Sequence, residues 1–139
     1  MTYDNVYVAS ISLGGNMQQT IKALTEAEKH DGPSLVIAYA PCITHGIKSG
    51  MKTSISEEKL AVESGYWPIF RYDPVNDKLN LDYKNPDFSK YYDLINNENR
   101  YMMTKAVNEE KAMELFELNK ESAIRRFEYY KKLSEKESE

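Results

Sequence analysis

The chain has 139 residues and a mass of 16.1 kDa, which is enough for one modest domain and too little for two. Hydrophobic residues make up 41% and charged residues 29%, as in globular proteins, and the net charge of −4 argues against a general nucleic-acid binder. The longest apolar run, residues 35–41, is too short to span a membrane, and no signal segment follows Met1. These features predict a cytoplasmic protein that binds neither nucleic acid nor membrane.

The first forty residues predict a strand, a helix and a second strand. Residues 6–13 are β-branched and apolar, and Gly14-Gly15 ends this strand. Asn16 can cap the following helix, with Gln19 as the reciprocal partner of a capping box. Residues 35–40 show no polar alternation, which is typical of a strand covered on both faces. The order predicts a right-handed βαβ unit with parallel strands.

The helix between these strands has its apolar residues at helical spacing and therefore has one apolar face. The residues of this face are Met17, Ile21, Leu24 and Ala27. The sequence Asp31-Gly32-Pro33 ends the helix, because glycine suits a left-handed exit and proline cannot continue the helix.

A short helix and a third strand follow a loop of small polar residues. Ser54 and Glu57 have the spacing of a second capping box and predict a short helix that ends at Gly65. Residues 67–72 predict the third strand. We place this strand at an edge of the sheet, because Pro68 has no amide donor.

The second half of the chain predicts turns followed by helices. Residues 73–87 are turn-rich, with a short strand at 79–81, and Asp87 caps a short helix over 88–96. The longest helix begins at Asn108 and runs to about residue 133. Its predicted buried stripe consists of Ala112, Leu115, Phe116, Ala123, Phe127 and Tyr130.

Cys42 is the main candidate for chemistry. It follows the second strand, at the carboxyl end of a parallel pair, where open α/β sheets place their ligand sites. His45 lies three residues further on. A single cysteine excludes an internal disulfide, and Cys42 with His45 supplies at most two of the four ligands of a zinc site. A buried inert cysteine, a nucleophile activated by His45, and one ligand of a metal centre completed by another segment all remain open.

Gly14-Gly15 after a strand invites comparison with a phosphate-binding loop. The dinucleotide pattern needs a third glycine, and Asn16 and Met17 follow instead. We therefore interpret the two glycines as an ordinary turn from strand to helix.

Several segments, taken in order, resemble the C-terminal region of pyruvate:ferredoxin (or flavodoxin) oxidoreductase. They are Val6-Tyr7-Val8-Ala9 through Asn16, the stretch from Asp31-Gly32-Pro33 to Pro41-Cys42-Ile43-Thr44-His45-Gly46-Ile47-Lys48, Glu57 to Glu63 with Gly65-Tyr66-Trp67, and Arg125-Arg126-Phe127-Glu128. The resemblance covers nearly the whole chain. Thr44 departs from it, since many relatives carry asparagine there.

The resemblance implies part of an enzyme that oxidatively decarboxylates pyruvate with coenzyme A. The products would be acetyl-CoA, carbon dioxide and electrons that pass through 4Fe–4S clusters to ferredoxin or flavodoxin. In this family the cysteine of the Pro-Cys-Ile-x-His-Gly segment is the remote fourth ligand of the cluster nearest the thiamine. Carried over, Cys42 is a metal ligand and the one cofactor-binding residue of this chain, which would have no catalytic residue of its own.

The resemblance also implies what this chain needs from elsewhere. The other three cysteine ligands and the Gly-Asp-Gly…Asn motif for magnesium and thiamine diphosphate are not in the sequence, and Asp31-Gly32-Pro33 lacks the first glycine. Thiamine diphosphate and Mg2+ would therefore bind only the full-length enzyme, which the resemblance implies is a homo-oligomer. The rest of the parent polypeptide is the first expected partner, and the isolated chain is expected to be inactive.

The expected fold is α/β, a partial thiamine-diphosphate-binding fold. Residues 1–139 would form a single C-terminal fragment with a βαβ core and edge strand in 1–72, a turn-rich segment with a short helix in 73–107, and a terminal helix in 108–139. Two other hypotheses remain. One is a non-catalytic scaffold or interaction domain with a thiamine-enzyme-like fold, and the other is a small cysteine-dependent enzyme that uses His45.

Overall fold

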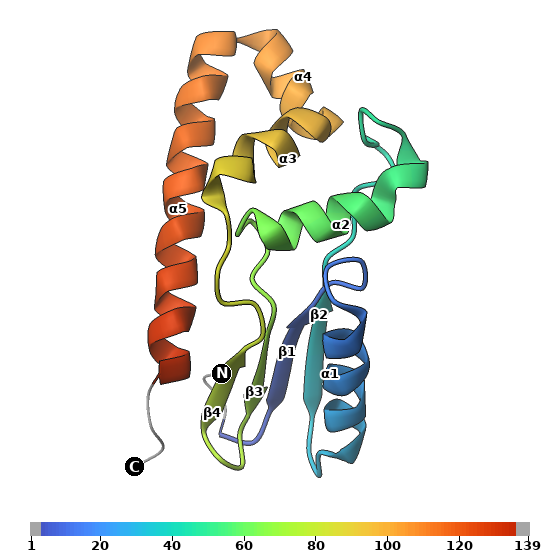
Figure 1. Cartoon of the computed structure of the whole chain (residues 1–139), viewed down its shortest axis with the longest axis vertical. Coiled ribbons are helices and arrows are strands. Elements are labelled where there is room, and N and C mark those ends of the chain that lie inside the picture. The colour runs from blue at the N-terminus through green and yellow to red at the C-terminus, as the bar shows by residue number, and fades with distance from the viewer. Residues whose placement is uncertain (1–3, 136–139) are drawn as a thin grey trace.

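A computed structural model describes residues 4–135 and contains one mixed sheet of four strands (Figure 1). The strands are β1 (Tyr7–Ile11), β2 (Ser34–Ala38), β3 (Phe70–Asp73) and β4 (Lys78–Leu81). Their order across the sheet is β2-β1-β3-β4. β1 and β2 are parallel, whereas β3 is antiparallel to both β1 and β4. The predicted βαβ unit with parallel strands is therefore confirmed.

Helices lie on both faces of this sheet and beyond one end of it. They are α1 (Met17–Lys29), α2 (Ser54–Glu63), α3 (Tyr91–Asn97), α4 (Asn99–Val107) and α5 (Glu109–Glu135), with short 3₁₀ turns η1 (Met51–Thr53) and η2 (Phe88–Lys90). Figure 1 shows α1 beside β2 and α5 on the opposite side, beside β4. Helices α2, α3 and α4 lie beyond the carboxyl ends of β1 and β2. No helix within residues 4–135 is long and apolar enough to cross a bilayer.

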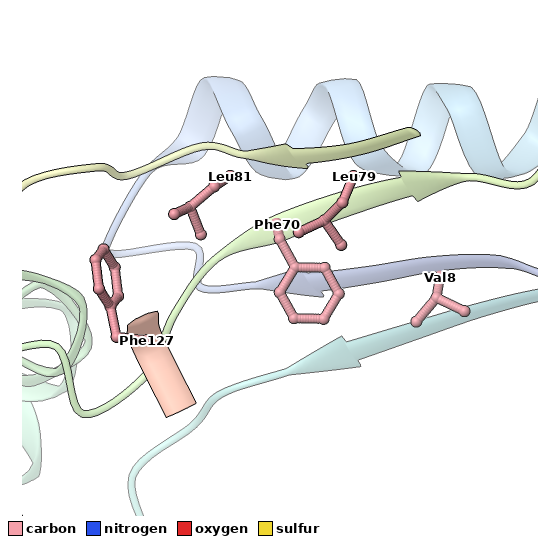
Figure 2. Close-up of a cluster of buried hydrophobic side chains, with 5 residues drawn as sticks. All are labelled: Val8, Phe70, Leu79, Leu81 and Phe127. Atoms are coloured by element: carbon pink, nitrogen blue, oxygen red, sulfur yellow. The ribbon is translucent and has the colours of Figure 1, made fainter. Parts of the chain in front are cut away.

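Alternate residues of β1 point to different cores, because successive side chains of a strand face opposite sides of a sheet. Tyr7, Ala9 and Ile11 pack with Ala23 of α1. Val8 belongs to the cluster on the other face, which Figure 2 shows. The residues of that second cluster are Val8, Phe70, Leu79, Leu81 and Phe127 of α5.

The sequence identified the starts of two helices correctly. The Asn16 side chain accepts a hydrogen bond from the backbone N–H of Gln19 (2.9 Å), and the Asn108 side chain accepts one from that of Lys111 (2.9 Å). The Asp87 side chain likewise accepts from the Ser89 amide, ahead of α3. Caps of this kind satisfy amides that have no partner within the helix.

The positions of the second and third strands in the sheet differ from the prediction. β3 lies between β1 and β4, and Pro68 does not restrict it, because the proline precedes the strand. β2 lies at an edge, and four of its five residues are exposed rather than covered on both faces. A continuous apolar run indicates burial only where other elements cover both faces of the strand. Helix α1 covers the face of β2 that carries Val36, whereas Leu35 and Ile37 on the other face are exposed.

Helix α1 turns a different face to the sheet than its apolar spacing predicts. Ala27 packs on the core, but the other three residues of the predicted face are at least half exposed: Met17, Ile21 and Leu24. Gln19 is buried, and its side-chain amide donates to the Ser10 carbonyl and to Asp82. The capping-box role predicted for Gln19 is therefore wrong, because its side chain binds the sheet.

Three further local predictions are also wrong. Ser54 donates to the Met51 carbonyl instead of capping α2, and the buried Glu57 side chain accepts from Asn97 rather than from an amide at the start of that helix. Leu115 is 45% exposed, although the rest of the predicted α5 stripe is buried or packed against a core. The α1 exit is not left-handed, since His30 ends the helix at φ −69° and Gly32 is not among the glycines with positive φ.

Helix α4 was not predicted from the sequence. Its apolar residues do not recur at the spacing of a single helical stripe, and it has no buried residue. With these differences, the α/β class and the long terminal helix are as the sequence predicts. The architecture is consistent with part of a thiamine-diphosphate-binding fold.

Candidate functional site

Cys42 lies in the loop that follows β2, at the carboxyl end of the parallel pair. Residues 41–50 form this loop, which we call the Cys42 loop. The thiol has intermediate exposure, so Cys42 is not the buried, inert cysteine that was one interpretation of the sequence. Its place at the end of parallel strands agrees with the usual location of ligands in open α/β sheets.

A tight turn brings the backbone of residues 44 and 45 toward the sulfur. The Gly46 amide donates to the Cys42 carbonyl (2.8 Å), and Gly46 has φ +75°, a conformation that other residues rarely adopt. His45 Nδ1 lies 3.2 Å from Cys42 Sγ. Either the thiol donates to an unprotonated Nδ1, or a protonated Nδ1 donates to the thiolate.

These contacts lower the pKa of the Cys42 thiol to about 7. The largest cause is a hydrogen bond from the His45 backbone amide, followed by the His45 imidazole and the Thr44 amide. Each donor stabilises the thiolate more than the thiol. A thiol with this pKa is substantially ionised near neutral pH.

The Cys42 loop is fastened to the junction between α3 and α4. The Asn99 side-chain amide donates to the His45 carbonyl (2.9 Å), and the Lys48 amide donates to the Asn97 carbonyl (2.7 Å). An isolated antiparallel bridge joins Ile47 to Glu98. The position of the sulfur therefore depends on a segment more than fifty residues further along the chain.

Two buried carboxylates, those of Glu57 and Glu98, form further contacts at this junction. Glu98 accepts a hydrogen bond from the Tyr39 hydroxyl (2.5 Å) and pairs with the Arg100 guanidinium at 2.8 Å. Glu57 accepts from the Asn97 side-chain amide, while its second oxygen has no hydrogen-bond partner among the described residues. Burial raises the pKa of Glu57, although the Asn97 bond opposes the shift.

Within residues 4–135 the Cys42 sulfur is the main reactive group at this site. No group of three or more His, Cys, Asp or Glu residues there could hold a metal ion. No carboxylate in the same range is hydrogen-bonded to the His45 imidazole, so a nucleophilic triad receives no support. The arrangement fits a thiolate that completes a centre whose other ligands come from another segment.

Gly14 and Gly15 bind no phosphate in this arrangement. The Gly14 amide donates to the Glu58 carboxylate (2.7 Å), which takes the position that an anionic ligand would need. A Cβ at Gly14 would lie 2.4 Å from the Ile55 carbonyl oxygen, so glycine is needed for close packing against α2. The interpretation as a turn between strand and helix is consistent with these contacts.

The residues that position Cys42 were not predicted from the sequence. Asn97, Glu98 and Asn99 lie within a polar run, Asn96-Asn97-Glu98-Asn99, where the prediction placed only the end of a short helix. Three amide or acid side chains at a helix end are a signal for backbone capping. Their contact with a distant loop could not be read from that pattern.

Comparison with known proteins gives several relatives of the whole chain. A pyruvate:ferredoxin oxidoreductase of Moorella thermoacetica is 49% identical over 97% of this chain, and a pyruvate-flavodoxin oxidoreductase of Klebsiella pneumoniae is 42% identical over 99%. A mitochondrial pyruvate dehydrogenase [NADP(+)] of Euglena gracilis is 43% identical over 81%. No family model matches the chain.

The chain spans only about 12% of the length of the first and second of these relatives and 6% of the third. It is thus homologous, over nearly all its residues, to a segment of the pyruvate:ferredoxin and pyruvate-flavodoxin oxidoreductases, which are enzymes.

Proposed function

We propose that this chain is the C-terminal part of an enzyme that oxidises pyruvate with coenzyme A and passes the electrons to ferredoxin or flavodoxin. The relatives, at 38–49% identity over most of the chain, are pyruvate:ferredoxin and pyruvate-flavodoxin oxidoreductases, which supports this substrate and these acceptors. The residues form one unit, 1–139, that depends on the remaining polypeptide for its chemistry. Its expected location is the cytoplasm.

Within that enzyme, Cys42 ligates one iron of a 4Fe–4S cluster as the single ligand from this chain. The observation that carries this proposal is the acidic thiol held by backbone amides at the open end of the parallel strands. Iron–sulfur ligation needs a thiolate, and N–H groups directed at sulfur tune the potential of a cluster. A thiol with a pKa of about 7 loses its proton to a metal with little cost at neutral pH.

The residues present can supply one ligand of a cluster and cannot supply all four. When bound, the cluster would remove electrons one at a time from the thiamine site. This chain would hold and orient one sulfur, shield it with His45, and fix the loop through Asn99. Thiamine diphosphate and Mg2+ would bind elsewhere in the full-length enzyme, which we expect to be a homo-oligomer.

The test is an assay of the full-length polypeptide that contains this sequence. With pyruvate, coenzyme A and a low-potential dye, the full-length enzyme should reduce the dye and form acetyl-CoA. A protein that binds iron but does not oxidise pyruvate would contradict the proposed substrate. A protein without bound iron and without activity would favour the scaffold hypothesis.

A further inference from the structure

Glu98 is the single residue between α3 and α4, which meet beyond the carboxyl ends of β1 and β2 (Figure 1). Its backbone is extended, with φ −88° and ψ 116°, so its peptide groups can pair with another segment as those of a strand do. Its side chain is buried, with an exposure of 2%. A carboxylate is costly to bury unless hydrogen bonds or an opposite charge compensate it, so the partners of Glu98 indicate its role.

The backbone at Glu98 holds the segment that leaves the Cys42 loop. Ile47 and Glu98 form an antiparallel bridge. Beside the bridge, the Lys48 amide donates to the Asn97 carbonyl at 2.7 Å. The end of the loop is therefore paired with the junction between the two helices in the manner of adjacent strands.

The carboxylate of Glu98 holds the segment that enters the same loop. Tyr39 directly follows β2, and its hydroxyl donates to Glu98 Oε1 at 2.5 Å. The Tyr39 ring is buried and packs against Trp67, with the ring centroids 5.5 Å apart. Burial and the Glu98 carboxylate both raise the pKa of Tyr39, so the hydroxyl keeps its proton and remains a donor.

The second oxygen of Glu98 is paired with Arg100. Arg100 Nε lies 2.8 Å from Glu98 Oε2, and another guanidinium nitrogen donates to the Tyr66 hydroxyl at 3.1 Å. The Tyr66 ring packs edge-on against Tyr39, with a centroid separation of 6.0 Å. These contacts compensate the buried charge and fix the direction of the carboxylate.

Both ends of the Cys42 loop therefore meet at one residue, which binds Tyr39 through its side chain and Ile47 through its backbone. Cys42 is three residues after Tyr39 and five before Ile47, so the sulfur lies on a short span between two fixed points. A buried ion pair is often no more stabilising than apolar residues of the same size. The arrangement thus favours a role for Glu98 in the geometry of the loop over a role in stability alone.

We propose that Glu98 is a positioning residue for the Cys42 ligand, because it joins the two ends of the loop so that the sulfur meets the cluster in one place. The inference rests on the proposed function, since it takes Cys42 as a cluster ligand. Without this connection the loop would hold Cys42 Sγ in several positions. The potential of a cluster depends on its ligands, the nearby charges and the hydrogen bonds around it, so the loss of Glu98 should change that potential.

The test uses Glu98→Ala in the full-length enzyme. Hydrogen exchange of residues 41–50 should become faster by about tenfold or more, as expected when a hydrogen bond to a charged group is lost. In a redox titration followed by electron paramagnetic resonance, the midpoint potential of the thiamine-proximal cluster should rise, because a negative charge is lost and Arg100 stays. The other clusters should keep their potentials. Wild-type exchange of the loop or an unchanged potential would overturn the proposal.

Two conservative variants separate the connection to Tyr39 from the charge of Glu98. Glu98→Gln keeps an oxygen that can accept from Tyr39 and should restore most of the protection of the loop. Tyr39→Phe keeps the charge, removes only one hydroxyl, and should make the loop exchange faster. The proposal is overturned if Glu98→Gln exchanges as fast as Glu98→Ala, or if Tyr39→Phe leaves the loop protected.

Ile95→Ala is the matched control for a general loss of stability, because Ile95 is fully buried in α3 and packs in the cluster that includes Phe116 of α5. This variant should lower the unfolding temperature without changing the exchange of the loop or the cluster potential. Equal effects in Ile95→Ala and Glu98→Ala would show that Glu98 acts through stability alone. Cys42→Ala tests the ligation separately, since a variant that keeps every cluster refutes the proposed role of Cys42 whatever the Glu98 variants do.

Discussion

At the scale of single residues, the acidity of Cys42 comes from its loop. Cys42 is the only cysteine of the chain, so alkylation of the purified 139-residue protein reports on one thiol. The rate of reaction with iodoacetamide should rise with pH through a midpoint of about 7. His45→Ala should move the midpoint upward, but not fully to about 8.5, because the backbone amides still donate. A wild-type midpoint near 8.5 would contradict the role of the loop.

Glu57 should make the free energy of unfolding decrease as the pH rises through its raised pKa. Burial raises its pKa in the folded protein, so the folded state binds the proton more tightly than the unfolded state. The contribution of Glu57 is then fully present below its ordinary pKa and is lost as pH rises through the raised value. Glu57→Gln should therefore stabilise the protein at pH 7, with an advantage that disappears toward pH 4. Urea unfolding at both pH values measures this, and a variant less stable at pH 7 would refute it.

At the scale of elements, one buried arginine joins α1 to the sheet. Arg71 of β3 is 7% exposed and binds Glu26 of α1 and Asp82 after β4 at 2.6–2.9 Å. Arg71→Ala should cost roughly 3 kcal/mol in the free energy of unfolding, since two carboxylates lose their counter-charge.

The control for Arg71 is Lys59→Ala, which removes an exposed pair with Glu63 and should cost less than about 0.5 kcal/mol. Equal costs for the two variants in urea unfolding would show that the arginine does not hold α1 in place.

Local signals in the sequence predicted the helices and strands better than they predicted which of these elements lie side by side. Asn16 was identified as a cap and Asn108 as a helix start because the hydrogen bond at a helix start joins residues only three apart. The order of the strands in the sheet could not be predicted from such local signals. Whether a strand such as β2 lies at an edge depends on segments that are distant in the chain or outside it. The same holds for Asn99, whose contact with the Cys42 loop spans fifty-four residues.

The candidate site could be predicted only in part. Cys42 followed from its place after a strand and from a resemblance, whereas its acidity depends on backbone amides whose direction is set by the turn at Gly46. The burial of Glu57 and Glu98 was not predicted, because charged residues are rarely fully buried unless they are paired. Glu57 was interpreted as a capping residue, and Glu98 received no role.

At the scale of the whole molecule, we propose that this chain depends on a larger polypeptide for its chemistry. The purified chain should show no turnover with pyruvate, coenzyme A and a low-potential dye, because one thiolate cannot hold a cluster and the chain has no thiamine motif. The full-length enzyme is the positive control. Turnover by the isolated chain that survives further purification would contradict this prediction.

We propose that Cys42 is the fourth ligand of a cluster in the full-length enzyme. Cys42→Ala removes one thiolate and should release iron from the thiamine-proximal cluster, while clusters with ligands from other segments stay assembled. Ile43→Ala, at an 82% exposed neighbour in the same loop, is the matched control and should keep all its iron.

Iron content and electron paramagnetic resonance of the reduced enzyme measure the outcome for both variants. We expect Cys42→Ala to lose the signal and iron of one cluster, to keep thiamine binding, and to transfer electrons more slowly. A full set of cluster signals with wild-type oxidation kinetics in Cys42→Ala would show that Cys42 is not a ligand.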